Sequence, residues 1–236
     1  MRGMKLSIVI PVLDEAERLA GLLAYLPSGR DGDPEIIVAD GGSQDGSPRI
    51  AAESGARVVE GYRGRGQQLA AGAASADGDV ILFLHADTVL PGNAAGQIAD
   101  ALRNPDVIGG NFALTFDGDD RFSRWLDGFY AWLRGCGFYY GDSAIFIRRD
   151  VLRRIGGIRP ISLMEDHDLV RRMEKAGRTV CLDSPGAVTS SRRFENRHPF
   201  GIVWQWVYLH LLYHAGLPHG LLARFYRSAR HSPGHR

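Results

Sequence analysis

Three acidic residues, Asp14, Asp40 and Asp87, each follow closely after a short apolar run that predicts a buried strand. The carboxyl ends of neighbouring parallel strands meet at one edge of a sheet, and ligands bind outside that edge. We therefore expect the three carboxylates to face one crevice. Carboxylates there can bind a ribose, a base, or a divalent metal that bridges phosphates. The alternative is that they are turn formers and helix caps, and this alternative is strongest for Asp14.

The segment His85-Ala86-Asp87 comes directly after the apolar run Val80–Leu84. Side chains alternate along a strand, so His85 and Asp87 are expected to point the same way. Mg²⁺ and Mn²⁺ prefer oxygen ligands and commonly take one or two carboxylates together with substrate phosphates. Asp87 supplies one such carboxylate, so the expected cofactor is Mn²⁺ or Mg²⁺. His85 is a second candidate ligand; the alternatives are that it hydrogen-bonds a phosphate or orients Asp87.

Glu165 and Asp166 open a predicted helix over residues 164–176. Acidic residues are favoured at a helix N-terminus for electrostatic reasons alone, which is the structural alternative. The same position keeps a carboxylate ionised, and a general base needs that state to accept a proton from a hydroxyl group. The pair is therefore a candidate for proton transfer.

Arg63 and Arg65 lie in the glycine-rich loop Gly61–Gly66, which is either an anion clamp or a plain exposed loop. A dinucleotide-binding fingerprint is not supported, because Leu69 occupies the place of the third glycine. The sequence contains no G-x-x-x-x-G-K-[ST] loop, which excludes ATPases and kinases of that type. The acidic turn Asp117–Asp120 is interpreted as a solvated loop.

Strand and helix patterns alternate along the first part of the chain. Strands are predicted at 6–12, 36–39, 56–59 and 80–84, separated by helices at 15–26, 49–54 and 67–76. Ser47 is the predicted N-cap of the second helix, with Pro48 at its first position. This alternation predicts an α/β fold with a mostly parallel sheet flanked by helices. Further helices are predicted at 91–103, 122–133, 150–155, 164–176, 200–213 and 221–228, and further strands at 108–116, 144–147, 179–182 and 187–190.

The chain has 236 residues, a formal net charge of +1 and a hydrophobic content of 44%, so nothing in its composition suggests a nucleic-acid partner. The charge is uneven, because residues 192–236 hold seven Arg against one acidic residue, Glu195. Such a segment favours an anionic partner surface, either phosphate or lipid headgroups. The two widely spaced cysteines and an N-terminus that predicts a strand rather than a signal peptide indicate a cytoplasmic protein.

The predicted helix at 200–213 is apolar on nearly all sides and includes Trp204, Trp206 and Tyr208. It is too short to span a bilayer, which takes about 20 residues. It is expected either to lie in a membrane interface, at the inner face of an anionic membrane, or to be buried against the core, or to form a homodimer contact.

Five segments of the chain form a joint pattern in a fixed order: SIVIPVLDEAE (7–17), IIVADGGSQDGS (36–47), GRGQQLAAGAASADGDVILFLHADT (64–88), YYGDSAIFIRRDVLRRIGG (139–157) and MEDHDLVRRMEKAG (164–177). Together they resemble the family 2 glycosyltransferases of GT-A fold, in a compact bacterial form. The resemblance implies a GT-A domain at 1–195, with a nucleotide-binding, mostly parallel sheet flanked by helices. Residues 196–236 are then an amphipathic, basic helical extension that packs on the domain or lies on a membrane.

The resemblance also implies roles for individual residues. Asp166 becomes the catalytic base, accompanied by Glu165, while Gly141 and Asp142 lie near the acceptor. Asp87 reaches the metal, but His85 replaces the first acid of the family's Asp-x-Asp motif. The residues implied in binding a nucleotide-diphosphate sugar are Pro11, Asp14, Glu15, Asp40, Gly41, Arg65, Ala86, Asp87 and Arg193.

The expected function is inverting transfer of a sugar from a nucleotide-diphosphate sugar to a hydroxyl acceptor. A divalent ion on Asp87 offsets charge on the leaving diphosphate, and Asp166 takes the acceptor proton. Two alternatives remain at this point. One is a nucleotidyltransferase on a similar sheet, which releases pyrophosphate; the other is a non-catalytic nucleotide-sugar-binding module.

Overall fold

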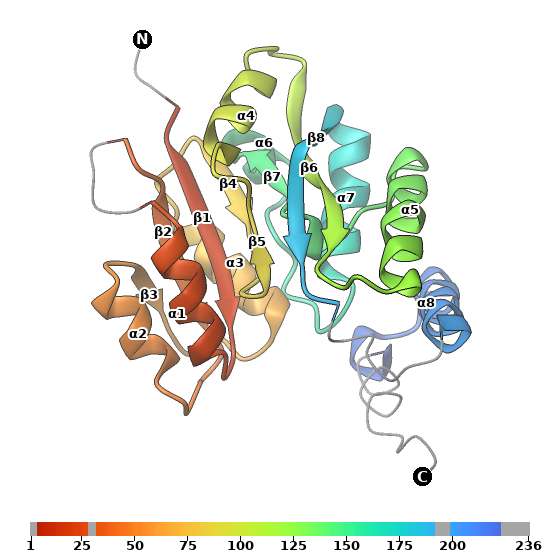
Figure 1. The fold of residues 1–236 in the computed structure, drawn as a ribbon, viewed down its shortest axis with the longest axis horizontal. Coiled ribbons are helices and arrows are strands. Elements are labelled where there is room, and N and C mark those ends of the chain that lie inside the picture. Colours follow the sequence, from red (N-terminus) through yellow and green to blue (C-terminus); the bar gives the residue numbers. More distant parts are fainter. Residues whose placement is uncertain (1–3, 28–31, 192–198, 223–236) are drawn as a thin grey trace.

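The computed structural model describes residues 4–27, 32–191 and 199–222, which form one mixed α/β unit around an eight-stranded sheet (Figure 1). The strands are β1 (Leu6–Val12), β2 (Glu35–Asp40), β3 (Arg57–Val59), β4 (Val80–Phe83), β5 (Thr88–Val89), β6 (Val107–Phe116), β7 (Phe146–Arg148) and β8 (Arg178–Thr189). The helices are α1 (Ala16–Tyr25), α2 (Ser47–Glu53), α3 (Arg65–Ser75), α4 (Ala94–Ala101), α5 (Arg121–Gly135), α6 (Arg149–Arg154), α7 (Glu165–Ala176) and α8 (Pro199–His214), with a short 3-10 helix η1 (Gly141–Ser143). The strand order is β3-β2-β1-β4-β7-β6-β8-β5.

The first four strands form a parallel sheet, in which β1, β2 and β4 are buried on both faces. Strand β1 pairs in parallel with β2 and with β4, and β2 pairs in parallel with β3. Ile8 and Ile10 pack in one apolar cluster, which includes Leu19 of α1, whereas Val9 between them packs in the other cluster with Leu69 of α3. The continuous apolar runs therefore reflect strands covered by helices on both sides, as predicted.

The sheet curls at its far edge. Strand β5 pairs antiparallel with β8, and it lies four places from β4 in the strand order. Only residues 84–87 join β4 to β5 in the sequence. In a flat sheet this separation would be roughly 19 Å, which is about the full reach of five extended residue steps. The connection also contains a turn, in which the N–H of Thr88 donates to the carbonyl of His85 at 3.1 Å. The far edge therefore has to bend back toward the carboxyl end of β4.

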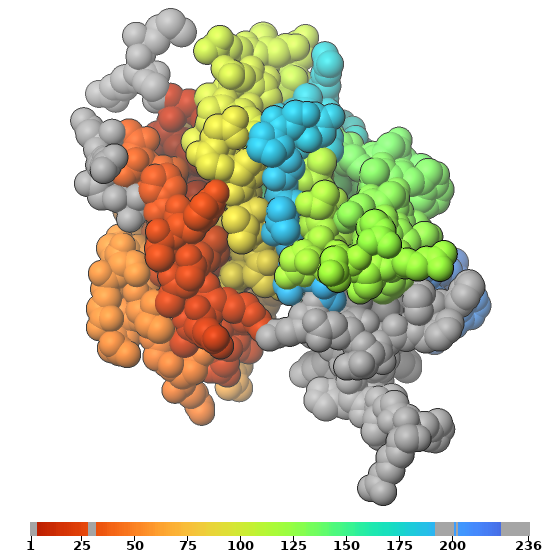
Figure 2. Space-filling model, viewed as in Figure 1, coloured from red at the N-terminus to blue at the C-terminus, as the bar shows by residue number. Residues whose placement is uncertain are grey.

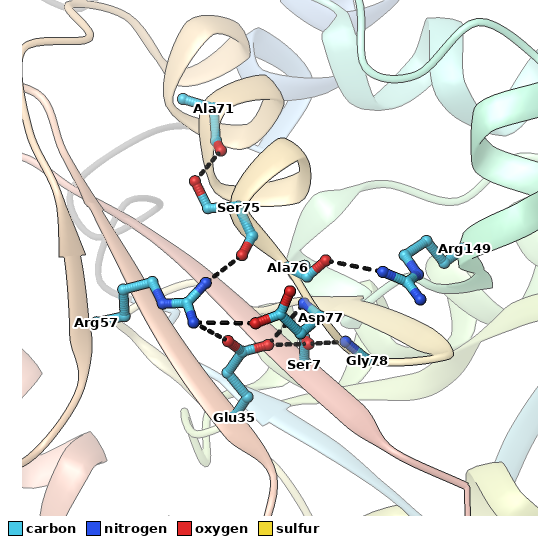
Figure 3. Close-up of polar contacts among 9 residues, drawn as sticks. All are labelled: Ser7, Glu35, Arg57, Ala71, Ser75, Ala76, Asp77, Gly78 and Arg149. Carbon is cyan, nitrogen blue, oxygen red and sulfur yellow. Dashed lines mark hydrogen bonds and ion pairs between the residues drawn. The ribbon is translucent and has the colours of Figure 1, made fainter.

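Polar side chains tie the amino ends of the strands together (Figure 3). Glu35 accepts hydrogen bonds from the hydroxyl of Ser7 at 2.6 Å and the N–H of Asp77 at 2.9 Å, and it pairs with Arg57 at 3.1 Å. The Ser7 hydroxyl in turn accepts the N–H of Gly78 at 2.8 Å. This network lies at the edge opposite the strand carboxyl ends, so it stabilises the sheet and leaves the other edge available for ligands.

Most predicted elements are confirmed, with ends shifted by a few residues. Strand β5 was not predicted, because two residues carry no readable periodicity. Strand β8 is a single strand with a register shift, where two strands were predicted. Gly186 allows β8 to run close beside β6, because a Cβ there would stand 2.3 Å from the carbonyl oxygen of Ala113 in β6. Figure 2 shows β8 reaching the surface between the segments around α4 and α5.

The predicted N-cap of α2 is wrong by one residue. Gly46, in the left-handed conformation with φ of 88°, is the N-cap, and Ser47 is the first helical residue. The Ser47 hydroxyl has other partners: it donates to Asp45 at 2.6 Å and accepts the N–H of Glu15 at 3.2 Å. Ser47 therefore joins the loop after β1 to α2 instead of capping the helix.

Helix α8 packs against α5 at one end of the molecule (Figure 1). The ring of Trp206 stacks on Phe129 of α5 with a centroid distance of 5.9 Å, and Leu209 is buried. No helix in the described part of the chain is long and apolar enough to cross a membrane. The predicted helix at 221–228 and the predicted boundary after residue 195 fall largely outside the described residues.

We predict that Ser7→Ala lowers the free energy of unfolding by about 1–3 kcal/mol, because the buried N–H of Gly78 loses its partner and Glu35 loses a donor. Denaturant unfolding measures this loss. The matched control is Ser54→Ala, since among the described residues the exposed Ser54 hydroxyl bonds to the carbonyl of Ile50 alone. The control should change stability by no more than about 0.5 kcal/mol. Equal losses in the two variants would contradict a structural role for the network.

Candidate active site

The loop after β2 is organised by Asp40, which is buried. One carboxylate oxygen accepts the N–H groups of Gly42 at 2.7 Å and of Ser43 at 2.9 Å, and the other accepts the Ser43 hydroxyl at 2.5 Å. Gly42 has a φ of 95°, which glycine adopts without steric cost. Both oxygens of Asp40 are therefore used to shape the loop that carries Gly41, at the carboxyl edge of the sheet.

Asp14, at the end of β1, is joined to the same loop. Its N–H donates to the Ser43 hydroxyl at 2.9 Å, and its carboxylate accepts the N–H of Gln44 at 2.7 Å. The neighbouring Glu15 forms an ion pair with Arg18. The predicted meeting of Asp14 and Asp40 at one sheet edge is thus observed, through the loop that both carboxylates hold.

Gln68 of α3 fastens the ends of β1 and β2 together. Its buried amide nitrogen donates to the carbonyl oxygens of Val12 at 2.7 Å and of Ala39 at 2.8 Å. A Cβ at Gly41 would stand 3.1 Å from that nitrogen, so glycine lets the loop lie directly over the amide. Sequence reasoning missed Gln68, although it belongs to the motif at 64–88, because one glutamine in an alanine-rich helix has no distinctive pattern.

Pro11 ends the pairing between β1 and β4. Pairing between β1 and β4 stops at Val9 and Phe83, and proline has no N–H with which to continue a ladder. The chain beyond β4 therefore separates from β1 and turns at His85. Pro11 still pairs with Ala39 of β2, so β1 separates from the chain after β4 but not from β2.

Ala86 and Asp87 are half-buried in this turn. The backbone carbonyl of Asp87 accepts the N–H of Ser190 at 3.3 Å, which anchors the turn to the end of β8. Among the residues that the structure describes, the Asp87 carboxylate makes no hydrogen bond or ion pair. The described residues also contain no group of three or more His, Cys, Asp or Glu arranged to hold a metal. A metal bound here would take at most two His, Cys, Asp or Glu ligands from the described residues.

Arg65, Glu165 and Asp166 meet in a small cavity whose lining also includes His85 and Gly141. The Arg65 guanidinium forms an ion pair with Glu165 and another with Asp166, the latter at 3.0 Å. The same Asp166 oxygen accepts the N–H of Gly141 at 3.0 Å. The structure thus joins the predicted base, the predicted acceptor loop and the first turn of α3 in one cluster.

The pKa values of Glu165 and Asp166 are shifted in opposite directions. Burial is the largest effect on Glu165 and raises its pKa despite the pairing with Arg65. Burial also opposes ionisation of Asp166, but Arg65 and the backbone N–H groups of Gly141 and His167 together outweigh it and hold the pKa of Asp166 below its ordinary value. Neighbouring carboxyl groups with separated pKa values are typical of acid–base sites. The lowered pKa of Asp166 keeps its carboxylate ionised at neutral pH.

The predicted acceptor residues lie in η1, beside this cluster. Asp142 is buried and accepts the hydroxyl of Tyr130 at 3.3 Å. Tyr140, just before η1, shares a hydrogen bond of 3.0 Å with the imidazole of His210 in α8. Burial, together with the charges of Asp166 and Asp142, raises the pKa of Tyr140. Tyr140 and His210 were not among the predicted site residues; only the position of Tyr140 beside Gly141 in the sequence pointed to it.

Strained backbone is concentrated at this site. Within the described residues, three non-glycine residues have positive φ: Asp14 at 52°, Ala144 at 51° and Met164 at 68°. Asp14 follows β1, Ala144 follows η1, and Met164 immediately precedes Glu165. Such conformations cost about 1–3 kcal/mol each and persist only where the surroundings impose them. The surroundings of these three turns therefore impose their backbone shape.

Other predicted residues have different surroundings. Arg63 is exposed. Asp168, the third acid of the first turn of α7, pairs with Arg159 at 2.9 Å and Arg172 at 2.7 Å, and so supports the fold. Asp120 in the acidic turn caps α5 by accepting the N–H of Ser123 at 2.7 Å. Arg193 lies outside the described residues.

The sequence profile of Glycosyl transferase family 2 matches residues 7–156, which is more than half of the chain. The chain belongs to this family. A curated family relative, an uncharacterized glycosyltransferase of Nostoc, is 29% identical over 126 residues, which are 50% of this chain and 39% of that protein. Glucosyl-3-phosphoglycerate synthase of Mycolicibacterium paratuberculosis is 31% identical over 99 residues, 38% of this chain and 30% of that protein.

The glycosyltransferase fold is also evident from solved structures. Glucosyl-3-phosphoglycerate synthase of Mycobacterium tuberculosis, crystallised with Mn²⁺, UDP and phosphoglyceric acid, matches with a TM-score of 0.59 and 20% identity over 92% of this chain and 80% of that one. A structure of the same enzyme with Mg²⁺ and UDP gives a TM-score of 0.61. At this level of identity the likeness shows the GT-A fold alone. The chain spans half or less of the length of the curated relatives described above.

We predict that Gly141→Ala lowers the rate of sugar transfer by about 100-fold, because its Cβ would stand 2.8 Å from the imidazole of His85 and displace η1 from Asp166. Release of nucleoside diphosphate from the nucleotide sugar measures the rate. Gly21→Ala is the matched control, since a Cβ at this α1 position meets nothing within 4 Å. Wild-type activity in Gly141→Ala would show that this close packing is unimportant for the reaction.

Proposed function

We propose that this family 2 member is an inverting glycosyltransferase that moves a sugar from a nucleotide-diphosphate sugar to an acceptor hydroxyl. The observation that carries the proposal is the cluster around Asp166. A carboxylate with a lowered pKa lies at a helix N-terminus, in a cavity bordered by Gly141 and His85. The lowered pKa keeps this carboxylate ionised, which is the state a base needs before it can take the proton of a hydroxyl group as it attacks a sugar.

The donor is proposed to bind at the carboxyl ends of β1, β2 and β4. Pro11, Asp14, Glu15, Asp40 and Gly41 border the first two of these ends. Both oxygens of Asp40 are occupied by its own loop. Asp40 would therefore contribute by fixing the backbone of that loop, whose polar groups can face the base and ribose. UDP in the related mycobacterial synthase supports a uridine nucleotide as the first to test.

The residues around Asp87 fit a divalent metal of the Mn²⁺ or Mg²⁺ type. Asp87 offers a carboxylate without a protein partner among the described residues, and His85 and Ala86 precede it in the same turn. Such ions are commonly held by one or two carboxylates plus substrate phosphates, so a full protein cage is not required. When bound, the ion would neutralise charge on the leaving diphosphate. Asp87 is the proposed ligand, with His85 as a second one.

The acceptor is proposed to enter beside η1. Gly141 positions Asp166 through its N–H, and Asp142 lies next to it, fixed by Tyr130. Asp166 would accept the proton of the attacking hydroxyl, while Glu165, held by Arg65, would keep the helix start in place. Arg65 is proposed to contact the donor diphosphate, which would then compete with Glu165 and Asp166 for its guanidinium group. Arg193 is the second proposed diphosphate contact.

The place of action is proposed to be the cytoplasm. Cys136 and Cys181 are both free thiols. Free cysteines persist in a reducing compartment, which supports this location.

We predict that Asp166→Asn lowers kcat by about 10²–10⁴-fold, because the amide cannot accept the proton, while donor binding is retained. A screen of UDP-, GDP- and dTDP-sugars by thermal shift identifies the donor. Steady-state release of nucleoside diphosphate then gives kcat. Glu165→Gln is the matched control and should lose less, because it keeps the hydrogen-bonding shape without removing the base. Full transfer activity in Asp166→Asn would show that another group is the base. Release of pyrophosphate would indicate a nucleotidyltransferase.

We also predict that Asp87→Ala abolishes the extra thermal stabilisation that Mn²⁺ gives to the nucleotide complex, because the ion loses its protein carboxylate. Thermal shift with nucleotide in the presence and absence of Mn²⁺ measures this difference. Asp77→Ala, at the opposite edge of the sheet, serves as control and should keep the metal effect. If Asp87→Ala responds to Mn²⁺ like the wild type, the ion binds elsewhere.

The pH dependence follows from Arg65. Since Arg65 helps to hold the pKa of Asp166 below its ordinary value, the acidic limb of kcat/KM should lie below the usual range of an aspartate. Arg65→Ala removes this stabilisation of the carboxylate, so the limb should move to higher pH. The pH profile of kcat/KM in wild type and Arg65→Ala measures the shift, with Arg63→Ala as control. An unmoved limb would mean that Asp166 does not control it.

A further inference from the structure

A fully buried histidine lies where α7 meets α8. The side chain of His167 is 0% exposed, and among the described residues neither of its ring nitrogens has a hydrogen-bond partner. Buried polar groups in folded proteins nearly always have such a partner, so each exception calls for an explanation. A neutral imidazole tolerates these surroundings far better than a charged one, because a buried charge without a partner is strongly disfavoured.

Aromatic rings surround His167, and three of them belong to α8. The rings of His210, Tyr213 and His214 lie at centroid distances of 5.0, 5.3 and 5.7 Å, each nearly perpendicular to the ring of His167. The ring of Phe138 stacks on His167 at 5.9 Å. Helix α8 therefore contacts α7 through a cluster of three imidazole rings.

Protonation of His167 would make this contact unfavourable. The imidazolium would carry a full charge in a buried position, and protonated His210 and His214 would add like charges beside it. Burial, followed by the charge of His210, lowers the pKa of His167 to about 4, although the charge of Asp166 acts in the opposite direction. The docked ring therefore stays neutral at pH values where an exposed histidine takes up a proton.

The surrounding groups offer little compensation for such a charge. The titratable and charged groups that face His167 and His210 are Asp166 and Arg171 of α7, Tyr140 before η1, and Tyr213 and His214 of α8. Asp166 is the one acid in this set, and its carboxylate already pairs with Arg65. Arg171 and His214 would repel a protonated His167.

His210 connects the cluster to the candidate active site. Its ε nitrogen shares a hydrogen bond of 3.0 Å with the hydroxyl of Tyr140. Tyr140 directly precedes Gly141, whose N–H donates to Asp166 at 3.0 Å. Burial lowers the pKa of His210 as well. Release of α8 would therefore remove a hydrogen bond from the residue next to Gly141.

We propose that His167 and His210 form a pH-sensitive contact, which holds α8 against α7 at neutral pH and releases it in acid. Above pH 6.5, the ordinary pKa of histidine, the docked and released states are both neutral, so docking has its full strength. Below pH 6.5 the released state takes up a proton that the docked state excludes. Docking then weakens by up to about tenfold per pH unit for each such histidine, until the pH reaches the docked pKa, about 4 for His167.

Hydrogen exchange followed by mass spectrometry tests the proposal. A helix of 16 residues is only marginally stable when isolated, so the amides of α8 exchange when it is released. After correction for intrinsic exchange rates, the protection of α8 is expected to fall by about 30-fold or more between pH 7 and pH 5. Helix α1, which contains no histidine, should keep its protection and serves as the internal reference.

His167→Phe keeps an aromatic ring in the cluster but cannot be protonated, so it should make the fall in α8 protection about tenfold smaller. The matched control is His214→Phe. His214 is exposed, so its proton can be hydrated without release of the helix, and this variant should keep the pH dependence. Far-UV circular dichroism at pH 7 checks that both variants fold.

Three results would overturn the proposal: equal protection of wild-type α8 at the two pH values, a parallel loss of protection in α1, or an unchanged fall in His167→Phe. If His167→Phe does not fold, the wild-type comparison of α8 with α1 decides alone. The proposal concerns the contact between the helices and holds whether or not the chain transfers a sugar.

Discussion

One guanidinium group connects two helix starts that lie a hundred residues apart in the sequence. Arg65 begins α3, in the parallel part of the sheet, and its partners Glu165 and Asp166 begin α7, a hundred residues later. Two carboxylates this close cannot both remain ionised away from water without a shared cation. The loop geometry serves this contact: a Cβ at Gly66 would stand 2.4 Å from the carbonyl oxygen of Ile161, so glycine allows α3 to approach the segment before α7.

The rest of the site depends on this connection. Because Asp166 pairs with Arg65 and accepts the N–H of Gly141, it ties the start of η1 to the start of α3. His167, the next residue, is fully buried and stacks on Phe138 at 5.9 Å. Burial is the main reason that the pKa of His167 falls to about 4, so this ring stays neutral where it packs against His210 and Tyr213 of α8. Charge is thus confined to one side of the helix start.

The sequence predicted the parallel strands and the edge at which the acids gather, because apolar runs mark buried strands and the polar residues after each run mark its carboxyl end. It predicted the pair at 165 and 166 from a similar local signal, the acids that open a helix. It could not predict that Arg65 would contact that pair, since nothing local links residues a hundred positions apart. Nor could it predict Gln68 or the pairing of β5, which depend on how the sheet curls. Positive φ at Ala144 and Met164 is likewise imposed by tertiary contacts and has no signal in residue type.

The hydrogen bond between Tyr140 and His210 of α8 has a defined donor and acceptor. The δ nitrogen of His210 lies 2.8 Å from the carbonyl oxygen of Trp206, and a carbonyl can only accept, so that nitrogen carries the hydrogen. Burial lowers the pKa of His210, so the ring is neutral and its ε nitrogen has a lone pair. The hydroxyl of Tyr140 must therefore donate to it. The Tyr140 oxygen is left with acceptor capacity only, and any molecule that hydrogen-bonds to it must bring the hydrogen. A hydroxyl group meets this requirement, whereas an ether or ester oxygen does not.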